Sequence, residues 1–226
     1  GILKVGTIVT NDADAGRPGC VSIGSGAFID PGFVAGYGSS VAIGTNAKVA
    51  GHLYGDGLAI GSNSHAYTYS VAVGSQAKAG TNYYSTAVGY YADAEAASAT
   101  AIGANTHAGQ ESVAVGINAD GSYNYGVAVG KSAALKADNG VALGYEAWAY
   151  ESAVAIGKSA KTQGTTAIAI GARVVAPTSG LVIGAAADNS ILSGSFNTSA
   201  ASTNGYLLTS TKFGINRTSA PDAMLD

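Results

Sequence analysis

Acidic side chains raise the question of catalysis first, because glycan hydrolases and lyases need paired carboxylates or a base beside an arginine. Eight acids are scattered singly through the middle of the chain: Asp56, Asp93, Glu95, Glu111, Asp120, Asp138, Glu146 and Glu151. Glu146 and Glu151 come nearest to a pair, and nothing else converges on them. No Gly-x-Ser-x-Gly segment has the strand–turn–helix context of a nucleophile elbow. We therefore expect no catalytic residues and no enzyme, with a glycan-active β-solenoid kept as an alternative.

Metal and cofactor chemistry has equally little support. The acidic segment 11–16 lacks the third oxygen ligand and the distant Glu of an EF-hand loop, so it is interpreted as a turn. The histidines His52, His65 and His107 are isolated, without the Cys/His clustering of a zinc site. Cys20 is the sole cysteine, which excludes an intrachain disulfide, and it falls in a column of small residues that suggests packing. We expect no metal and no cofactor.

Aromatic residues are the better candidates for a binding function. The 13 tyrosines avoid the apolar repeat positions described below and gather in short segments that read as turns. Tyrosine and tryptophan offer large contact areas with few rotatable bonds, and their rings stack on sugars or on partner side chains. The hypothetical receptor-contact residues are Tyr90, Tyr91, Tyr145, Trp148 and Tyr150. The alternative is that these rings cover neighbouring coils or fill gaps between subunits.

Composition limits the class of protein. In the 226 residues, Lys+Arg 11 stand against Asp+Glu 14, which predicts no nucleic-acid partner. Charged residues make up 11%, against about 25% in an ordinary globular domain. No apolar stretch approaches the roughly 20 residues that span a bilayer, so no membrane insertion is expected. No signal peptide is visible, and the start at Gly1 suggests a processed product or an expressed fragment.

An internal repeat must position these residues. The segment Val113-Ala114-Val115-Gly116 recurs with small changes through most of the chain. The repeat glycines stand at 24, 44, 61, 74, 89, 103, 116, 130, 144, 157, 171 and 184. Their usual spacing of 13–14 residues is too short for helical repeats and suits a narrow coil of two strands and two turns. The sequence thus predicts an all-β parallel β-solenoid, with stacked coils about 4.8 Å apart.

Each coil carries two apolar faces on its first strand. The residue before the repeat glycine is Ile, Val or Leu, the residue two positions earlier is aliphatic except at Thr86 and Thr100, and alanine usually stands between them. Alternate strand residues face opposite sides, so both faces should be buried although a narrow coil has one interior. We assign the alanine face to an interface between chains. The predicted trimer-interface residues are Ala42, Ala72, Ala114, Ala128, Ala142, Ala155 and Ala169.

The stretch after each glycine predicts the opposite strand of the coil. In Ala47-Lys48-Val49 and Ala147-Trp148-Ala149, small residues should face in and varied residues should face solvent. The expected divisions are an N-terminal cap and strand at 1–19, the β-roll at 20–187, and a C-terminal transition with a small β segment at 188–226.

The run at 70–79, repeated at 112–119, resembles the head repeat of YadA-type trimeric autotransporter adhesins, over roughly 20–187. The resemblance implies a left-handed parallel β-roll, with three rolls packed around one axis as a homotrimer. The partner it implies is a receptor on the host surface, either a glycan or an outer-membrane protein.

The C-terminal segment 212–226 instead resembles one common in phage tail fibres, although Asn216 replaces the usual glycine and Ala220 is an extra residue before Pro221. In such fibres this segment often lies upstream of a chaperone that is cleaved off after trimerisation. The main hypothesis is therefore a trimeric tail-fibre segment of a virion that mediates host attachment. The alternative is the head of a bacterial adhesin at the cell surface. An ice-binding solenoid is disfavoured because the outward column four residues past each glycine is mixed.

Overall fold

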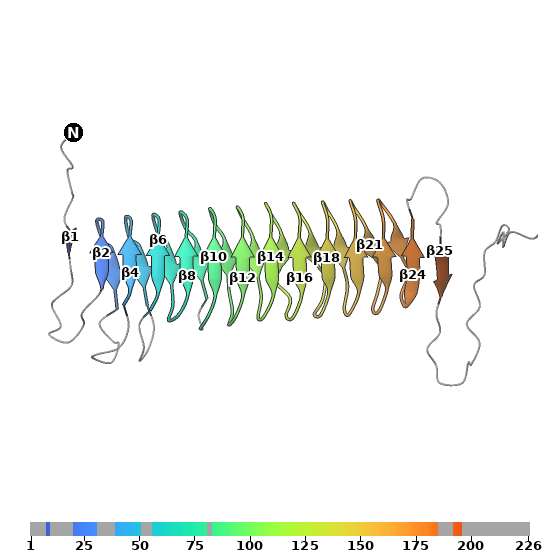
Figure 1. Ribbon diagram of the computed structural model, residues 1–226, viewed down its shortest axis with the longest axis horizontal. Helices are drawn as coiled ribbons and strands as arrows, with labels where there is room; N and C mark the ends of the chain where they lie inside the picture. Colours follow the sequence, from blue (N-terminus) through green and yellow to red (C-terminus); the bar gives the residue numbers. More distant parts are fainter. Residues whose placement is uncertain are drawn as a thin grey trace, which may run out of the picture.

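The computed structural model describes residues 20–30, 39–50, 56–80 and 83–184, together with the backbone of two short strands at 8–9 and 192–195. These residues form an all-β parallel solenoid, a long, narrow stack of similar coils (Figure 1). The rest of the predicted N-terminal cap and most of the predicted C-terminal segment lie outside the described residues, as do His52 and segment 212–226.

Two sheets run the length of the stack. The first sheet has 14 strands: β1 (Ile8–Val9), β2 (Val21–Ile23), β4 (Val41–Ile43), β6 (Leu58–Ile60), β8 (Val71–Val73), β10 (Thr86–Val88), β12 (Thr100–Ile102), β14 (Val113–Val115), β16 (Val127–Val129), β18 (Val141–Leu143), β20 (Val154–Ile156), β22 (Ile168–Ile170), β24 (Gly180–Ile183) and β25 (Leu192–Ser195). The second sheet has 11 strands: β3 (Phe28–Ile29), β5 (Lys48–Val49), β7 (His65–Ala66), β9 (Lys78–Ala79), β11 (Asp93–Ala94), β13 (His107–Ala108), β15 (Asp120–Gly121), β17 (Ala134–Leu135), β19 (Trp148–Ala149), β21 (Lys161–Thr162) and β23 (Val175–Ala176).

The repeat is kept in register from coil to coil. Val113, Ala114 and Val115 pair in parallel with the same residue types one coil further on, at 127–129. Backbone hydrogen bonds tie successive coils together; the N–H of Gly130, for example, donates to the carbonyl of Val115 at 2.8 Å. Strands β1 and β25 pair antiparallel at the two ends of the first sheet, so neither β2 nor β24 presents a bare edge.

The repeat glycines mark the first turn of each coil. Gly116 has φ +132, and a Cβ added there would lie 2.6 Å from the carbonyl oxygen of Gly130 in the next coil. Only glycine satisfies both the left-handed backbone and the close approach of neighbouring coils. Two residues later, Asn118 is left-handed at φ 55, and Asn46, Asn63 and Asn105 occupy the same position in their coils. Because asparagine tolerates this conformation better than most residues, backbone geometry accounts for the recurring asparagines.

The interior of the coil is lined by alanine, and this corrects the predicted trimer interface. The seven alanines assigned to the interface are completely buried within a single chain: Ala42, Ala72, Ala114, Ala128, Ala142, Ala155 and Ala169. They pack toward the small inward residues of the second sheet, such as Ala108 and Ala149. Because small residues on both sides of the coil are already completely buried, the interior has no room for two facing layers of valine and isoleucine. The large aliphatic side chains therefore point outward, so the sequence-based assignment of the two faces was inverted.

Larger inward residues are compensated by glycine. Leu135 is completely buried, and a Cβ on Gly126 would collide with its Cδ1 atom. A Cβ on Gly140 would come within 3.2 Å of the other Leu135 methyl group. Val49 is accommodated in the same way beside Gly57. Interior volume is thus conserved across neighbouring coils, as close packing requires.

The residues immediately before the first-sheet strands form a column of small side chains that take part in hydrogen bonds. Buried Ser112 accepts a hydrogen bond from the N–H of Gly126 at 3.1 Å and donates to the carbonyl oxygen of Tyr123. Cys20 begins this column, half-buried and packed against the core, which confirms its predicted role in packing. Among the described residues, no helix is long and apolar enough to cross a membrane.

Candidate binding surfaces

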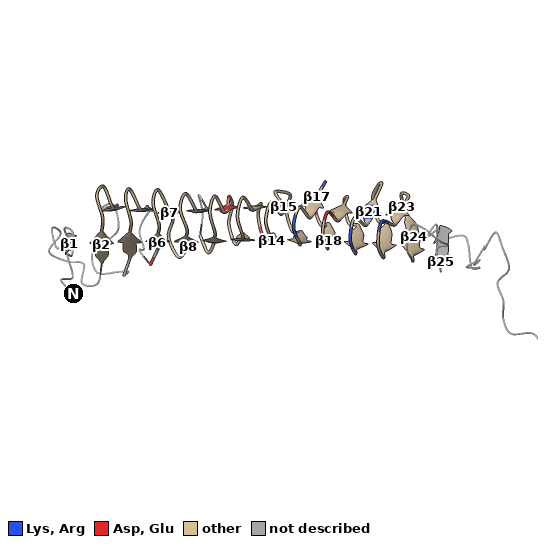
Figure 2. Ribbon diagram, turned by 90° about the horizontal axis from the view of Figure 1, so that it is seen from above, with Lys and Arg blue, Asp and Glu red and all other residues tan. Residues whose placement is uncertain are grey.

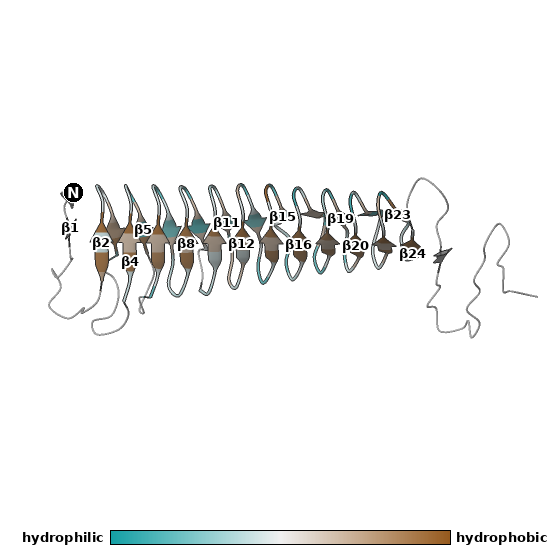
Figure 3. Cartoon of the chain, turned by 45° about the horizontal axis from the view of Figure 1, so that its top comes forward, coloured by the Kyte–Doolittle hydropathy of each residue, from teal (hydrophilic) through white to brown (hydrophobic). Residues whose placement is uncertain are grey.

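The outward face of the first sheet is an almost uninterrupted apolar strip, which we call the aliphatic face. Its two columns, one and three residues before the repeat glycines, are Val21, Ile23, Val41, Ile43, Leu58, Ile60, Val71, Val73, Thr86, Val88, Thr100, Ile102, Val113, Val115, Val127, Val129, Val141, Leu143, Val154, Ile156, Ile168, Ile170, Leu181 and Ile183. All are partly or largely exposed in the single chain, with Ile102 at 39% and Ile168 at 37%. Figure 3 colours most of the even-numbered strands brown, which marks their residues as hydrophobic.

This strip is too large to be left in water. Twelve coils at about 4.8 Å give a strip on the order of 50 Å long. Soluble monomers rarely expose a contiguous apolar patch of more than a few hundred Å². Its only polar members are Thr86 and Thr100, which pair with each other in adjacent strands β10 and β12. The aliphatic face therefore has the character of a surface that another protein surface covers.

The outward face of the second sheet, which we call the mixed face, differs completely. One residue per coil points outward from it: Phe28, Lys48, His65, Lys78, Asp93, His107, Asp120, Ala134, Trp148, Lys161 and Val175. The inward neighbours are buried and mostly small, and most of the outward residues are at least partly exposed, as the sequence predicted. No residue type forms a continuous column. The mixed face can therefore present different local sites along the fibre.

The predicted receptor-contact residues do not form one patch. Tyr90 and Tyr91 follow β10 and stack edge to face, with ring centroids 4.5 Å apart. Trp148 lies on β19, four coils beyond β11, or roughly 19 Å along the stack at the usual strand spacing. Tyr145 precedes β19, in the turn on the same side of the coil as Tyr90 and Tyr91, whereas Tyr150 follows β19 in the other turn.

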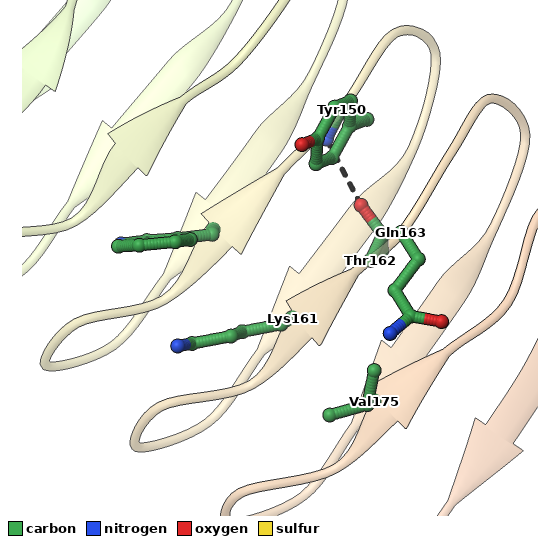
Figure 4. Close-up of a pocket in the computed structure, with 6 residues that line it drawn as sticks. Tyr150, Lys161, Thr162, Gln163 and Val175 are labelled. Atoms are coloured by element: carbon green, nitrogen blue, oxygen red, sulfur yellow. Dashed lines mark hydrogen bonds between the residues drawn. The ribbon is translucent and has the colours of Figure 1, made fainter.

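Trp148 and Tyr150 do share a surface hollow. It is about 360 Å³ in volume and is also lined by Lys161, Thr162, Gln163 and Val175 (Figure 4). The N–H of Tyr150 donates to the Thr162 hydroxyl at 2.9 Å, which joins the second turn of one coil to the next strand. The ammonium group of Lys161 lies 4.1 Å from the centre of the indole ring, and that of Lys136 lies 4.7 Å from it. Trp148 is therefore held between cations of the coils before and after it.

Tyr145 is bracketed in the same manner. Lys131 and Lys158, which occupy its column in the two neighbouring coils, each place an ammonium group 5.8 Å from its ring centre. A hydrogen bond to Glu146, together with the charge of that carboxylate, raises the pKa of the Tyr145 hydroxyl. Sequence reasoning found the aromatic rings but missed the lysines. The sequence did contain this information, because the position one residue after the repeat glycine is occupied in three successive coils by Lys131, Tyr145 and Lys158.

A second hollow of about 430 Å³ lies beside Tyr91. Its other lining residues are Asn63, Gln76, Lys78 and Asp93, and the last two form an ion pair at 4.0 Å. This hollow therefore carries paired rather than free charge. A separate aromatic group, outside the predicted set, forms in the opposite turns, where the rings of Tyr69 and Tyr84 stack at 5.4 Å.

The histidines and the acids occupy ordinary positions on the coil. His107 lies 2.8 Å from Glu95 on the exposed mixed face. His65 is half-buried against Tyr67, and burial, with added repulsion from Lys48 and Lys78, lowers the pKa of His65. Glu146 and Glu151 lie in two different turns and do not converge. Within the described ranges, no group of three or more His, Cys, Asp or Glu residues could hold a metal ion.

Three segments of the stack match a known family model, that of the YadA head domain repeat (2 copies): residues 38–52, 81–106 and 151–173. The chain carries YadA head domain repeats. The matched segments lie near the start, in the middle and near the end of the stack, and together they cover less than a third of the chain. No curated protein and no solved structure matches the chain.

The YadA match bears on the two functions weighed from sequence and supports one of them better than the other. YadA-like heads are trimeric, bind the host surface and belong to a non-enzymatic adhesin family of the bacterial cell surface. The adhesin alternative is thereby favoured over the main hypothesis. Nothing in the comparisons supports a phage tail fibre or a virion, and none of the matched segments includes residues 212–226.

Proposed function

We propose that the chain forms the head of a trimeric autotransporter adhesin, in which three left-handed rolls pack through their aliphatic faces and attach a bacterial cell to a host surface. The aliphatic face carries the proposal. It extends over the whole described stack and stays partly exposed in one chain. The match to YadA head repeats, whose heads are trimeric, supports an arrangement in which this face meets two copies of itself.

The energetics favour self-association over solvent exposure. Completing the burial of a half-exposed Val, Leu or Ile contributes about 1 kcal/mol. Twenty-two of the 24 positions on the aliphatic face are aliphatic, so the total gain exceeds the roughly 4–15 kcal/mol that association costs in lost freedom. A copy of the same chain is the natural occupant, because it presents the same residues at the same coil spacing.

Receptor contact is proposed for the aromatic residues that remain outside this interface. The proposed contacts are Tyr90 and Tyr91 at one site, and Tyr145, Trp148 and Tyr150 at another. Each ring is exposed in the single chain. Exposed aromatic rings bring contact area at a low entropic cost, which suits a binding surface on a rigid scaffold.

Absolute mass in solution tests the assembly. Light scattering on a size-exclusion column should give about 66 kDa, three times the 22.1 kDa of one chain. Attachment of the same material to host cells tests the adhesin role and should saturate with added protein. A monomer, or a trimer that fails to attach to any host surface tried, would contradict the proposal.

A further inference from the structure

We infer that the coil of Tyr145 and Trp148, with the four lysines that bracket it, is a binding site for an acidic polysaccharide, one that carries carboxylate or sulfate groups. The inference rests on the proposed adhesin function and gives its second aromatic site a ligand class. The site comprises Lys131, Lys136, Lys158 and Lys161 with the two aromatic rings.

The lysines are arranged symmetrically about the aromatic coil. Lys131 and Lys136 come from the coil before it, and Lys158 and Lys161 from the coil after it. Each ammonium group lies within 5.8 Å of the centre of a Tyr145 or Trp148 ring. Cation–π attraction of this kind orients the long side chains without neutralising their charge.

The positive charge at this site is available to a ligand. Among the described residues, no carboxylate lies within 4.0 Å of any of these four ammonium groups. Nearby acids have other partners: Asp138 accepts a hydrogen bond from the N–H of Asn124 at 2.9 Å, and Glu146 accepts hydrogen bonds from the Tyr145 hydroxyl and from Ser159, the latter at 3.3 Å. The earlier coils contrast with this site, because residues 83–125 carry four acids and no lysine or arginine (Figure 2).

The aromatic and polar lining points to sugar units rather than to nucleic acid. Trp148 and Tyr150 border the hollow with the exposed amide of Gln163, a combination that offers ring edges and hydrogen bonds to a pyranose (Figure 4). A carboxylate or sulfate on that unit would meet the ammonium groups of Lys136 and Lys161. A nucleic-acid duplex would extend over the acidic coils from β11 to β15, where its phosphates are repelled.

The only tryptophan of the chain, Trp148, reports binding directly. Indole emission of the intact trimer would be followed during titration with hyaluronan, which carries carboxylates only, with dextran sulfate, which carries sulfates only, and with neutral dextran. We expect a saturable change with one or both acidic polymers and none with neutral dextran. The polymer that changes the indole emission identifies whether the site binds carboxylate or sulfate groups.

Two double variants distinguish a specific site beside Trp148 from a nonspecific attraction of acidic polymers to lysine side chains. Lys136→Gln with Lys161→Gln should weaken binding at least tenfold. Lys48→Gln with Lys78→Gln removes the same charge from the mixed face away from Trp148, and should change the affinity less than twofold. Both variants should keep the mass of the trimer, since all four side chains lie on the outside of the coil.

Three results would overturn the inference: no emission change with either acidic polymer, equal weakening in both double variants, or equally tight binding of duplex DNA. Each could occur in a trimer that still attaches to host cells. Failure of the ligand class is therefore distinct from failure of the proposed function, which would appear as a monomer or as lost attachment.

Discussion

The aliphatic face and the mixed face are connected by the same turns, repeat at the same coil spacing and both point outward. They differ in how their side chains vary from coil to coil. The first repeats valine, leucine and isoleucine through nearly every coil, whereas the second changes from lysine to histidine, aspartate and tryptophan. A uniform column fits a partner that is itself uniform along the fibre. A changing column fits ligands that contact a few coils. In the function we propose, this contrast separates the surface for assembly from the surface for recognition.

The largest effect should come from charging one face and then the other within a single coil. Ile168 and Val175 belong to the coil of Gly171, are similarly exposed at 37% and 44%, and face opposite directions. Ile168→Glu should dissociate the trimer, because three unpaired carboxylates would be buried near the axis. Val175→Glu should leave the mass unchanged. Light scattering measures the mass of both variants, and a trimeric Ile168→Glu variant would show that the aliphatic face is not the trimer interface.

A second prediction sharpens the division between interior and exterior. Ala142→Leu should destabilise the roll by about 2 kcal/mol, because the completely buried alanine column has no room for three more carbon atoms. Ala172→Leu makes the same substitution at an exposed turn residue and should change stability by less than about 0.5 kcal/mol. Urea unfolding measures both. Equal stability of the two variants would mean that the alanine column is not the interior.

The sequence predicted much of the fold. The glycine interval gave the coil length, and the small inward residues just before the second-sheet strands were identified correctly at Ala47 and Ala147. The alternation of residue types along a strand shows that its two faces differ, but it does not show which face lies inside the coil. Volume could have decided the question, because glycines neighbour Leu135 where the second sheet contributes a large inward side chain. Two facing sheets that each require small residues leave no room for the valine and isoleucine columns.

The candidate site was less predictable than the fold. Residue type singled out Trp148 and Tyr150, but only the coil geometry joins them to Lys161 and Gln163, which are 11–15 residues away in sequence. Tyr90 and Tyr91 were grouped with them because they share a residue type, and the structure separates them by four coils. Contacts in a solenoid join residues that are about one coil apart in sequence. The residues of one site therefore come from neighbouring coils rather than from one continuous segment.

The smallest predicted effect concerns pH on the mixed face. The lowered pKa of His65 means that the folded chain resists protonation more than the unfolded chain, whose histidine titrates near 6.5. The stability that His65 contributes is therefore complete above pH 6.5 and is lost as pH falls through the folded value. Lys48, Lys78 and Tyr67 surround the ring.

We expect a slightly lower Tm at pH 5.5 than at pH 7.5, and a smaller difference in His65→Gln. His107→Gln, in the same column beside Glu95, is the matched control. If His65→Gln lost as much stability on acidification as the unsubstituted chain, His65 would not be the group responsible.

Solvent access to the aliphatic face tests the central claim most directly. In a Cys20→Ser background, Ile168→Cys and Val175→Cys each place one thiol on a different face of the same coil, and maleimide labelling of the native protein compares them. The account predicts that Val175→Cys labels at the rate of a free thiol, whereas Ile168→Cys is protected until the protein is denatured. Equal labelling of both thiols in the native protein would show that the aliphatic face is uncovered, and would contradict the account.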